Sequence, residues 1–138
     1  MPGNNKIVLD TNVIISAAIS ENGNAAKIFE MMIEERFESY TSNDIIEEII
    51  DVFSRKKISK LIKPDDQARI VDIFKRFSVI VTRIKKLNVV KDDPKDNMFL
   101  ECALSAKADY IISGDTHLLD MGEYNGIKVL SPAQFLKM

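Results

Sequence analysis

KIVLDTN, residues 6–12, is the short stretch that decides the fold of this chain. Its apolar residues run continuously instead of alternating, which is typical of a β-strand buried on both faces. The run ends directly in Asp10, and a charge at the end of a buried strand is unfavourable unless it finds a partner. The stretch therefore predicts a central strand whose carboxyl end carries a paired or functional acid.

Strand-like and helix-like segments alternate outward from this stretch. Further strands are expected at residues 37–41, 79–81, 109–113 and 127–130. Helices are expected at residues 12–19 and 25–35, from Ser42 or Asn43 to about Arg55, from Pro64 to about Phe77, and from Asp93-Pro94 to about Ala106. Strands separated by helices need crossover connections, so we predict an α/β fold with a five-stranded, mainly parallel sheet and helices on both faces.

The composition is that of one soluble domain, residues 1–138. Apolar residues at 46% and charged residues at 29% argue against disorder. A single cysteine, Cys102, excludes an internal disulfide framework and a cysteine-rich zinc site. Because no apolar run approaches the roughly 18 residues that span a bilayer, and no signal peptide is recognisable, a cytoplasmic protein without a membrane partner is expected.

Two acids follow predicted strands directly. In open α/β sheets, ligands bind beyond the carboxyl ends of the strands. Asp10 stands at that end of the first strand, and Asp115 follows Ser113 at the end of the fourth. Both acids are therefore expected at one edge of the sheet, where Asn12, Thr11 and Ser113 could orient a water molecule or a phosphate oxygen.

Two predicted helices add candidate acids to this edge. Asp96 lies in the first turn of the helix that Asp93 can cap, where the helix dipole favours negative charge. Glu47 and Glu48 lie almost symmetrically beside the apolar face of the helix that starts at Ser42 or Asn43. Helical periodicity barely separates them, although Val52 widens the apolar face on the side of Glu48.

Such a cluster of acids suits a hard divalent cation. Mg²⁺ and Mn²⁺ prefer oxygen ligands, and bound cations of this kind can activate water and stabilise a leaving oxygen of a phosphodiester. One or two ions, about 4 Å apart, could be held in this way. Without a cation the carboxylates would repel one another, and some would take up protons.

At these residues the chain resembles the PIN-domain family, in particular the PIN toxins of bacterial and archaeal toxin–antitoxin systems. The resemblance is carried by IVLDTNVIIS at 7–16, TSNDIIEEI at 41–49, DPKDN at 93–97 followed by Phe99-Leu100, and ADYIISGDTHLL at 108–119. These stretches follow the family's order and spacing over nearly the whole chain. Any one of them is a weak signal, whereas their combination is specific.

The resemblance implies a metal-dependent endoribonuclease with a three-layer α/β/α sandwich fold. It implies Mg²⁺ or Mn²⁺ ligands at Asp10, Glu48, Asp96 and Asp115. It favours Glu48 over Glu47, because the family's glutamate precedes an apolar residue. It also implies an RNA substrate, a homodimer, and an antitoxin protein whose peptide lies in a groove near the site.

The sequence departs from the family's pattern at one position. Many PIN domains carry a further acid two residues after the fourth, and His117 stands there in this chain. A second metal ion is therefore expected to be weak or absent until substrate binds. His117 could act as an acid, a base or a ligand, but a loop histidine without an evident partner is expected instead.

Simpler interpretations exist for each acid. Asp10 and Asp93 could cap helices, Asp96 could serve the helix dipole, Asp115 could be a turn residue, and Glu48 could be a solvated surface acid. An aspartyl phosphatase would also place Asp10 after the first strand, but it needs a second acid two residues on, where this chain has Asn12. The remaining alternative is a PIN-like RNA- or protein-binding module with a weak or latent site.

Basic residues form two stretches, although the net charge of −2 is not that of a protein that binds nucleic acid by phosphate contacts alone. The first stretch comprises Arg55, Lys56, Lys57, Lys60 and Lys63. The second comprises Arg83, Lys85, Lys86, Lys91 and Lys95. Either could bind an RNA backbone or be an ordinary solvated face. Because tryptophan is absent, stacking on bases is expected to be minor.

Overall fold

The computed structural model describes residues 5–87 and 97–138. Within them a six-stranded sheet has the order β3-β2-β1-β4-β6-β5, with every neighbouring pair parallel except β5 and β6. The strands are β1 (Lys6–Leu9), β2 (Glu38–Thr41), β3 (Ser78–Ile80), β4 (Tyr110–Ile112), β5 (Glu123–Tyr124) and β6 (Ile127–Leu130). The mainly parallel sheet predicted from the sequence is therefore confirmed.

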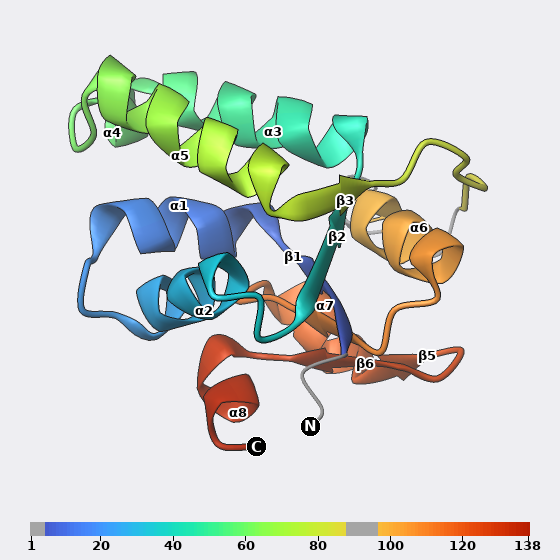
Figure 1. Ribbon diagram of the computed structural model, residues 1–138. Coiled ribbons are helices and arrows are strands. Elements are labelled where there is room, and N and C mark those ends of the chain that lie inside the picture. The colour runs from blue at the N-terminus through green and yellow to red at the C-terminus, as the bar shows by residue number, and fades with distance from the viewer. Residues whose placement is uncertain (1–4, 88–96) are drawn as a thin grey trace.

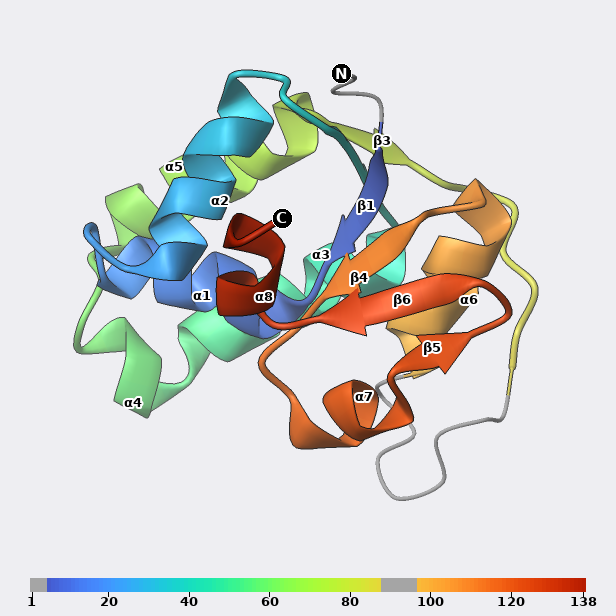
Figure 2. The ribbon, with the colours of Figure 1, turned by 90° about the horizontal axis from the view of Figure 1, so that it is seen from below.

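Helices cover both faces of this sheet, as the three-layer prediction requires. They are α1 (Thr11–Ile19), α2 (Asn24–Ile33), α3 (Asn43–Ser54), α4 (Lys56–Ser59), α5 (Pro64–Arg76), α6 (Asn97–Ala106), α7 (Thr116–Met121) and α8 (Pro132–Leu136). Figure 1 shows α1 and α2 on one side of β1 and β2, and α6 on the other side. Helix α6 contacts β1, β2 and β4, whereas α8 packs on α2 and β6, as the second view also shows (Figure 2).

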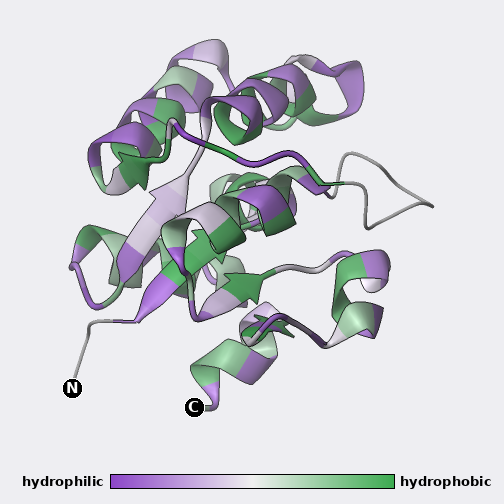
Figure 3. Cartoon of the chain, turned by 90° about the vertical axis from the view of Figure 1, so that its right-hand side faces the viewer, coloured by the Kyte–Doolittle hydropathy of each residue, from purple (hydrophilic) through white to green (hydrophobic). Residues whose placement is uncertain are grey.

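The middle of the sheet forms the centre of the hydrophobic core. Ile7 and Val8 of β1 and Ile111 and Ile112 of β4 have no exposed surface, so both faces of these strands are covered. Figure 3 shows hydrophobic colour in the middle of the sheet, while the helices alternate between hydrophobic and hydrophilic colours along their length. That alternation is expected of amphipathic helices that cover a buried sheet.

The predicted number of strands was wrong, because the described residues contain one strand more than expected. Strand β5 is only two residues long and pairs antiparallel with β6. The turn between them is Asn125-Gly126, with φ angles of 49° and 85°. Asn-Gly is a frequent sequence in tight hairpins because both positions need positive φ. A two-residue strand has too few side chains to show a periodic pattern, so only the turn could have revealed it.

Short helices were also not predicted. Helix α8 is the clearest case, because its start carries a complete capping box. The Gln134 N–H donates to Ser131 Oγ at 3.1 Å, and the Ser131 N–H donates to Gln134 Oε1 at 2.8 Å. For α3 the structure resolves the open choice of cap, since the Ile45 N–H donates to Ser42 Oγ at 3.3 Å.

The buried acid Glu101 on α6 holds the segment that follows β3 through a hydrogen bond. The Leu87 N–H donates to Glu101 Oε2 at 2.7 Å, although Glu101 is only 5% exposed. Lys86 Nζ lies 2.8 Å from Asp44 Oδ2 and 3.7 Å from Glu101 Oε1. Because Asp44 is in the first turn of α3, Lys86 links α3 to α6. The next residue of α6, Cys102, is completely buried, and burial raises the pKa of its thiol to about 12.

We predict that Glu101→Ala lowers the free energy of unfolding by about 1–3 kcal/mol, because it leaves the Leu87 N–H without its acceptor. Glu101→Gln keeps an acceptor oxygen and should lose less. Urea unfolding measures both changes, with Glu47→Ala at an exposed position of α3 as the control. Equal losses for Glu101→Ala and Glu47→Ala would contradict the role given to Glu101.

Candidate functional site

The parallel pairing of β1 with β4 places Asp10 beside Ser113. Leu9 is in register with Ile112, and the Asp10 N–H donates to the Ile112 carbonyl at 3.0 Å. The residues that follow these two strands are therefore neighbours at the carboxyl edge of the sheet. Ser113 is completely buried there, and its N–H donates to the Leu130 carbonyl of β6 at 2.9 Å.

The Ser113 hydroxyl joins the two strand-end acids. Its O–H donates to Asp10 Oδ2 at 2.5 Å. The same oxygen accepts the Asp115 N–H at 2.9 Å. The sequence had suggested Ser113 only as a residue that orients water or phosphate. The structure shows that it also fixes Asp10 against the segment that carries Asp115.

Both acids stand at helix starts, but only one of them caps its helix with a hydrogen bond. Asp115 Oδ1 accepts the His117 N–H at 2.7 Å, so Asp115 is the N-cap of α7 and not a simple turn residue. Asp10 occupies the N-cap position of α1 without a capping hydrogen bond from its side chain. Capping therefore does not account for the burial of Asp10, which is 3% exposed.

Burial dominates the electrostatics of Asp10. Loss of solvent raises the pKa of its carboxyl group from 3.8 to about 6. The Ser113 hydroxyl and the Asn12 and Thr11 backbone N–H groups act in the opposite direction, whereas the negative charge of Asp115 raises the pKa further. A carboxyl group in this position is poorly stabilised as an anion, and a nearby cation would favour its ionised form.

The structure distinguishes Glu48 from Glu47. The Glu48 side chain is 15% exposed, whereas Glu47 is exposed to solvent. Glu48 is therefore not a fully solvated surface acid. Its Oε1 lies 3.7 Å from Arg55 Nη2, and the same guanidinium nitrogen donates to Asp51 Oδ2 at 3.0 Å. Glu48 thus pairs with the C-cap residue of its helix and makes no hydrogen bond with Asp10 or Asp115.

The remaining candidates are placed as follows. Asp93 and Asp96 lie outside the described residues, so the structure does not place them. Asn12 is exposed on the first turn of α1, beside Asp10. His117 belongs to α7 and not to a loop, and its Nδ1 lies 3.8 Å from Asp115 Oδ1. The expectation of a loop histidine without a partner was therefore wrong.

The oxygen donors at this edge fit a hard divalent cation. Asp10 and Asp115 supply carboxylates, Ser113 supplies a hydroxyl, and the buried Asp10 has no ion-pair partner among the residues that the structure describes. These are the ligand types that Mg²⁺ and Mn²⁺ prefer. Among residues 5–87 and 97–138 no group of three or more acid, histidine or cysteine side chains is close enough to hold a metal ion. The four-ligand set therefore stays a prediction.

Sequence reasoning missed two polar groups near or behind this edge, Glu101 and Thr41. Glu101 looked like one position in the apolar run of α6, and only its three-dimensional partners show its role. Thr41 Oγ1 is buried without a hydrogen-bond partner among the described residues, and so is Oγ1 of Thr11, which the sequence had already suggested as an orienting residue. The one available signal was a charged residue inside an otherwise apolar helical stretch, which requires a partner when it is buried.

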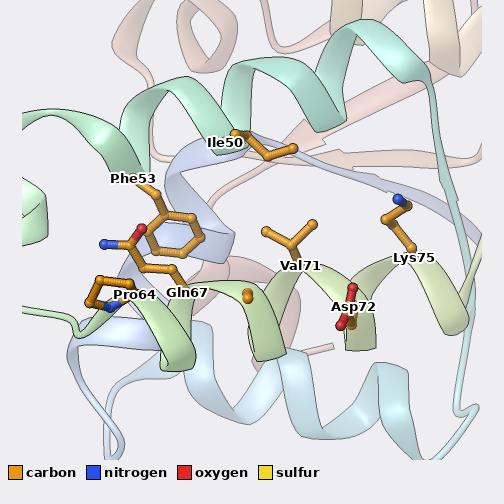
Figure 4. A pocket seen from close by; sticks show the side chains of 8 residues that line it. Ile50, Phe53, Pro64, Gln67, Val71, Asp72 and Lys75 are labelled. Carbon is orange, nitrogen blue, oxygen red and sulfur yellow. The ribbon is translucent and has the colours of Figure 1, made fainter.

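An apolar groove lies between α3 and α5, apart from the strand-end acids. It encloses about 390 Å³. In Figure 4, Ile50 and Phe53 extend from α3, and Pro64, Gln67 and Val71 line the opposite wall on α5. Ile50 is 50% exposed, which is unusual for an isoleucine and leaves apolar surface open to a partner.

Comparisons with known proteins agree with this fold. The model of the PIN domain family matches residues 6–117. The uncharacterized protein MJ1680 of Methanocaldococcus jannaschii is 34% identical over an alignment of 141 positions that covers 96% of this chain and 90% of that protein. The crystal structure of VapBC2 from Rickettsia felis, bound to a DNA fragment from their promoter, contains a similar chain. It has a TM-score of 0.60 and 13% identity over 91% of this chain and 98% of that one, so it shows a shared fold.

No helix among the residues that the structure describes is both long and apolar enough to cross a membrane.

We predict that Asp10 makes the stability of the metal-free protein depend on pH. Between about pH 4 and about pH 6 the folded protein binds a proton that the unfolded chain has released, because the pKa of Asp10 is higher in the folded state. The contribution of Asp10 to stability is therefore present below this window and is lost as the pH rises through it. The loss is at most about 3 kcal/mol.

Asp10→Asn should remove this dependence. Relative to the unsubstituted chain, the variant should gain stability as the pH rises from about 4 to about 7. Urea unfolding in the presence of a chelator measures the difference, with Asp72→Asn at an exposed position of α5 as the matched control. The same pH dependence in both variants would show that burial of Asp10 is not its cause.

Proposed function

The chain belongs to the PIN domain family, a family of nucleases, and on this premise we propose that it is a metal-dependent endoribonuclease that hydrolyses phosphodiester bonds of RNA. One observation carries the proposal, namely the buried Asp10 carboxylate, which accepts the Ser113 O–H while the same hydroxyl accepts the backbone N–H of the second strand-end acid, Asp115. A buried acid with a raised pKa next to a second acid is typical of functional sites and is unfavourable for stability alone.

Asp10, Glu48, Asp96 and Asp115 are the proposed ligands of Mg²⁺ or Mn²⁺. Such an ion, when bound, lowers the pKa of a water molecule and neutralises charge on the phosphate. Asp10 would hold the ion as a carboxylate, whose orientation the Ser113 O–H fixes. Glu48, whose Oε1 lies 3.7 Å from Arg55 Nη2, would supply a further carboxylate oxygen. Asn12, exposed beside Asp10, positions water or a phosphate oxygen.

Two alternatives remain distinguishable from this proposal. In an aspartyl phosphatase Asp10 would be the nucleophile, but Asn12 stands where the general acid is needed and cannot donate a proton usefully. Trapping with beryllofluoride would label Asp10 only in that mechanism. In a binding module with a latent site, the acids would hold no metal and would cleave no RNA. Calorimetry with Mn²⁺, with and without RNA, separates that case.

We also propose that the protein acts in the cytoplasm as the toxin of a toxin–antitoxin pair, by analogy with the VapBC2 assembly. The apolar groove between α3 and α5 supports a protein partner, because Ile50 is half exposed and the groove offers a concave surface. We propose a homodimer because the chain resembles PIN toxins, among which homodimers are common. Coexpression with the neighbouring gene and size-exclusion chromatography test both assemblies.

Asp10→Asn and Asp115→Asn should each abolish Mn²⁺-dependent cleavage of a labelled RNA. The expected loss exceeds the roughly 10–100-fold that removal of an outer-shell partner causes, because these acids would contact the ion directly. Asp120→Asn, at an exposed position of α7, is the control. Thermal unfolding verifies that each variant is folded. Undiminished cleavage by a folded Asp10→Asn or Asp115→Asn variant would refute the mechanism.

Ser113→Ala should shift the acid limb of the pH–rate profile to higher pH. The Ser113 hydroxyl lowers the pKa of Asp10, so its removal raises that pKa and delays ionisation of the carboxyl group. Apparent Mn²⁺ affinity should fall about 10–100-fold at neutral pH. Ser39→Ala removes another buried hydroxyl, which contacts Ser78 Oγ at 2.7 Å, and serves as the matched control. An unshifted profile in Ser113→Ala would contradict the positioning role.

A further inference from the structure

We propose that the junction of α3 and α4 is the surface that binds the RNA backbone and guides it to the strand-end acids. This surface, the basic corner, comprises Arg55, Lys56, Lys57, Lys60 and Lys63. All of its residues are exposed, and the sequence from 55 to 63 contains no acid. The inference rests on the proposed function, because it concerns the substrate of that same site.

The lysines of the basic corner are available to a ligand. None of them forms an ion pair with another residue in the described parts of the chain, and Arg55 alone is engaged, with Glu48 and Asp51. In the second basic stretch, Lys86 is held between Asp44 and Glu101, and Lys91 and Lys95 lie outside the described residues. A local excess of positive charge in a chain of net charge −2 creates a local field that attracts polyanions.

Helix α3 connects the basic corner to the candidate metal site. The helix starts after Ser42, which follows β2 at the carboxyl edge of the sheet, and its 12 residues extend about 18 Å. Figure 1 shows α4 at the far end of α3, which runs above α1. Contacts between α1 and α3 keep both helices together. An RNA strand with its scissile phosphate near Asp10 can therefore continue along α3 to the corner.

Arg55 shows that the corner and the site share one side of α3. Its guanidinium group reaches back along the helix to within 3.7 Å of Glu48, one of the proposed ligands. When Glu48 turns to a cation, the Arg55 guanidinium loses part of its negative partner. A phosphate group can then take that place, since guanidinium and phosphate form charge-assisted hydrogen bonds.

The composition of the corner favours contacts with phosphate over contacts with bases. Residues 55–63 contain no aromatic side chain on which a base could stack. Lysines bind phosphates as point charges and carry no sequence information. The corner should therefore strengthen the binding of every RNA to a similar extent, and any sequence preference must arise elsewhere on the protein.

The test is the salt dependence of RNA binding by the full chain. The combined variant Lys56→Gln, Lys57→Gln and Lys60→Gln removes three charges but leaves Arg55 with Glu48. A matched variant, Lys27→Gln, Lys128→Gln and Lys137→Gln, removes the same charge from exposed positions on α2, on β6 and after α8. Both are made in an Asp10→Asn background, so that a labelled single-stranded RNA stays intact during fluorescence anisotropy measurements over a range of KCl concentrations.

The corner variant should reduce the slope of log K against log [KCl] by about 2, since each single-strand phosphate contact contributes roughly 0.7. Its affinity should fall about tenfold or more, equally for two unrelated RNA sequences. The matched variant should keep most of the original slope. An unchanged slope in the corner variant, or equal changes in both variants, would overturn the proposal.

The failure of this inference is distinguishable from failure of the proposed function. If the unsubstituted chain cleaves RNA with Mn²⁺ but the corner variant binds RNA with an unchanged slope, only the corner is wrong. If no cleavage occurs and the slope still falls in the corner variant, the corner binds RNA and the catalytic proposal is wrong. If the corner variant bound RNA as well as the unsubstituted chain does but bound an acidic protein more weakly, the choice of RNA as the ligand would be overturned.

Discussion

The parallel pairing of β1 with β4 is the constraint on which the candidate site depends. It is made by backbone hydrogen bonds between strands that are buried except at their first residues, so side-chain changes at the surface cannot move the two strand ends apart. The Asp10 N–H continues this pairing by donating to Ile112, and Ser113 is fixed in the same way against Leu130 of β6. The acids are thus brought together by the core of the sheet, and the helices they begin then extend away from a common edge.

In this arrangement, two physical requirements conflict with each other. The core needs β1 and β4 to be buried to their last residue, whereas an ionised carboxylate needs solvent or a positive partner. Asp10 meets the first demand at the expense of the second, which is why its pKa rises to about 6. Ser113 offsets part of the penalty with one hydrogen bond. The cation that the proposed function places at this site would resolve the conflict, whereas a purely structural role for Asp10 would not.

The sequence predicted the strands and helices whose apolar residues form a continuous or periodic pattern, and the residues that stand at strand ends. The continuous apolar run before Asp10 and the strand before Ser113 placed both acids at one edge, as the structure shows. Helical periodicity barely separates Glu47 from Glu48, and the family resemblance favours Glu48. Only the packed helix shows that the Glu48 side chain is sheltered from solvent. Strand β5 was missed because two residues carry no period. The Ser113 bridge and the Glu101 contacts depend on rotamers and on distant backbone groups, which local sequence does not encode.

The buried cysteine on α6 has a consequence for the surroundings in which such a site can operate. Cys102 is the chain's single thiol, and with a pKa of about 12 and no exposed surface it is neither a thiolate nor reachable. Thiolates, and not thiols, react with oxidants and bind soft metals. The folded chain therefore presents no sulfhydryl chemistry to its environment, and oxidants that attack thiolates find none on its surface.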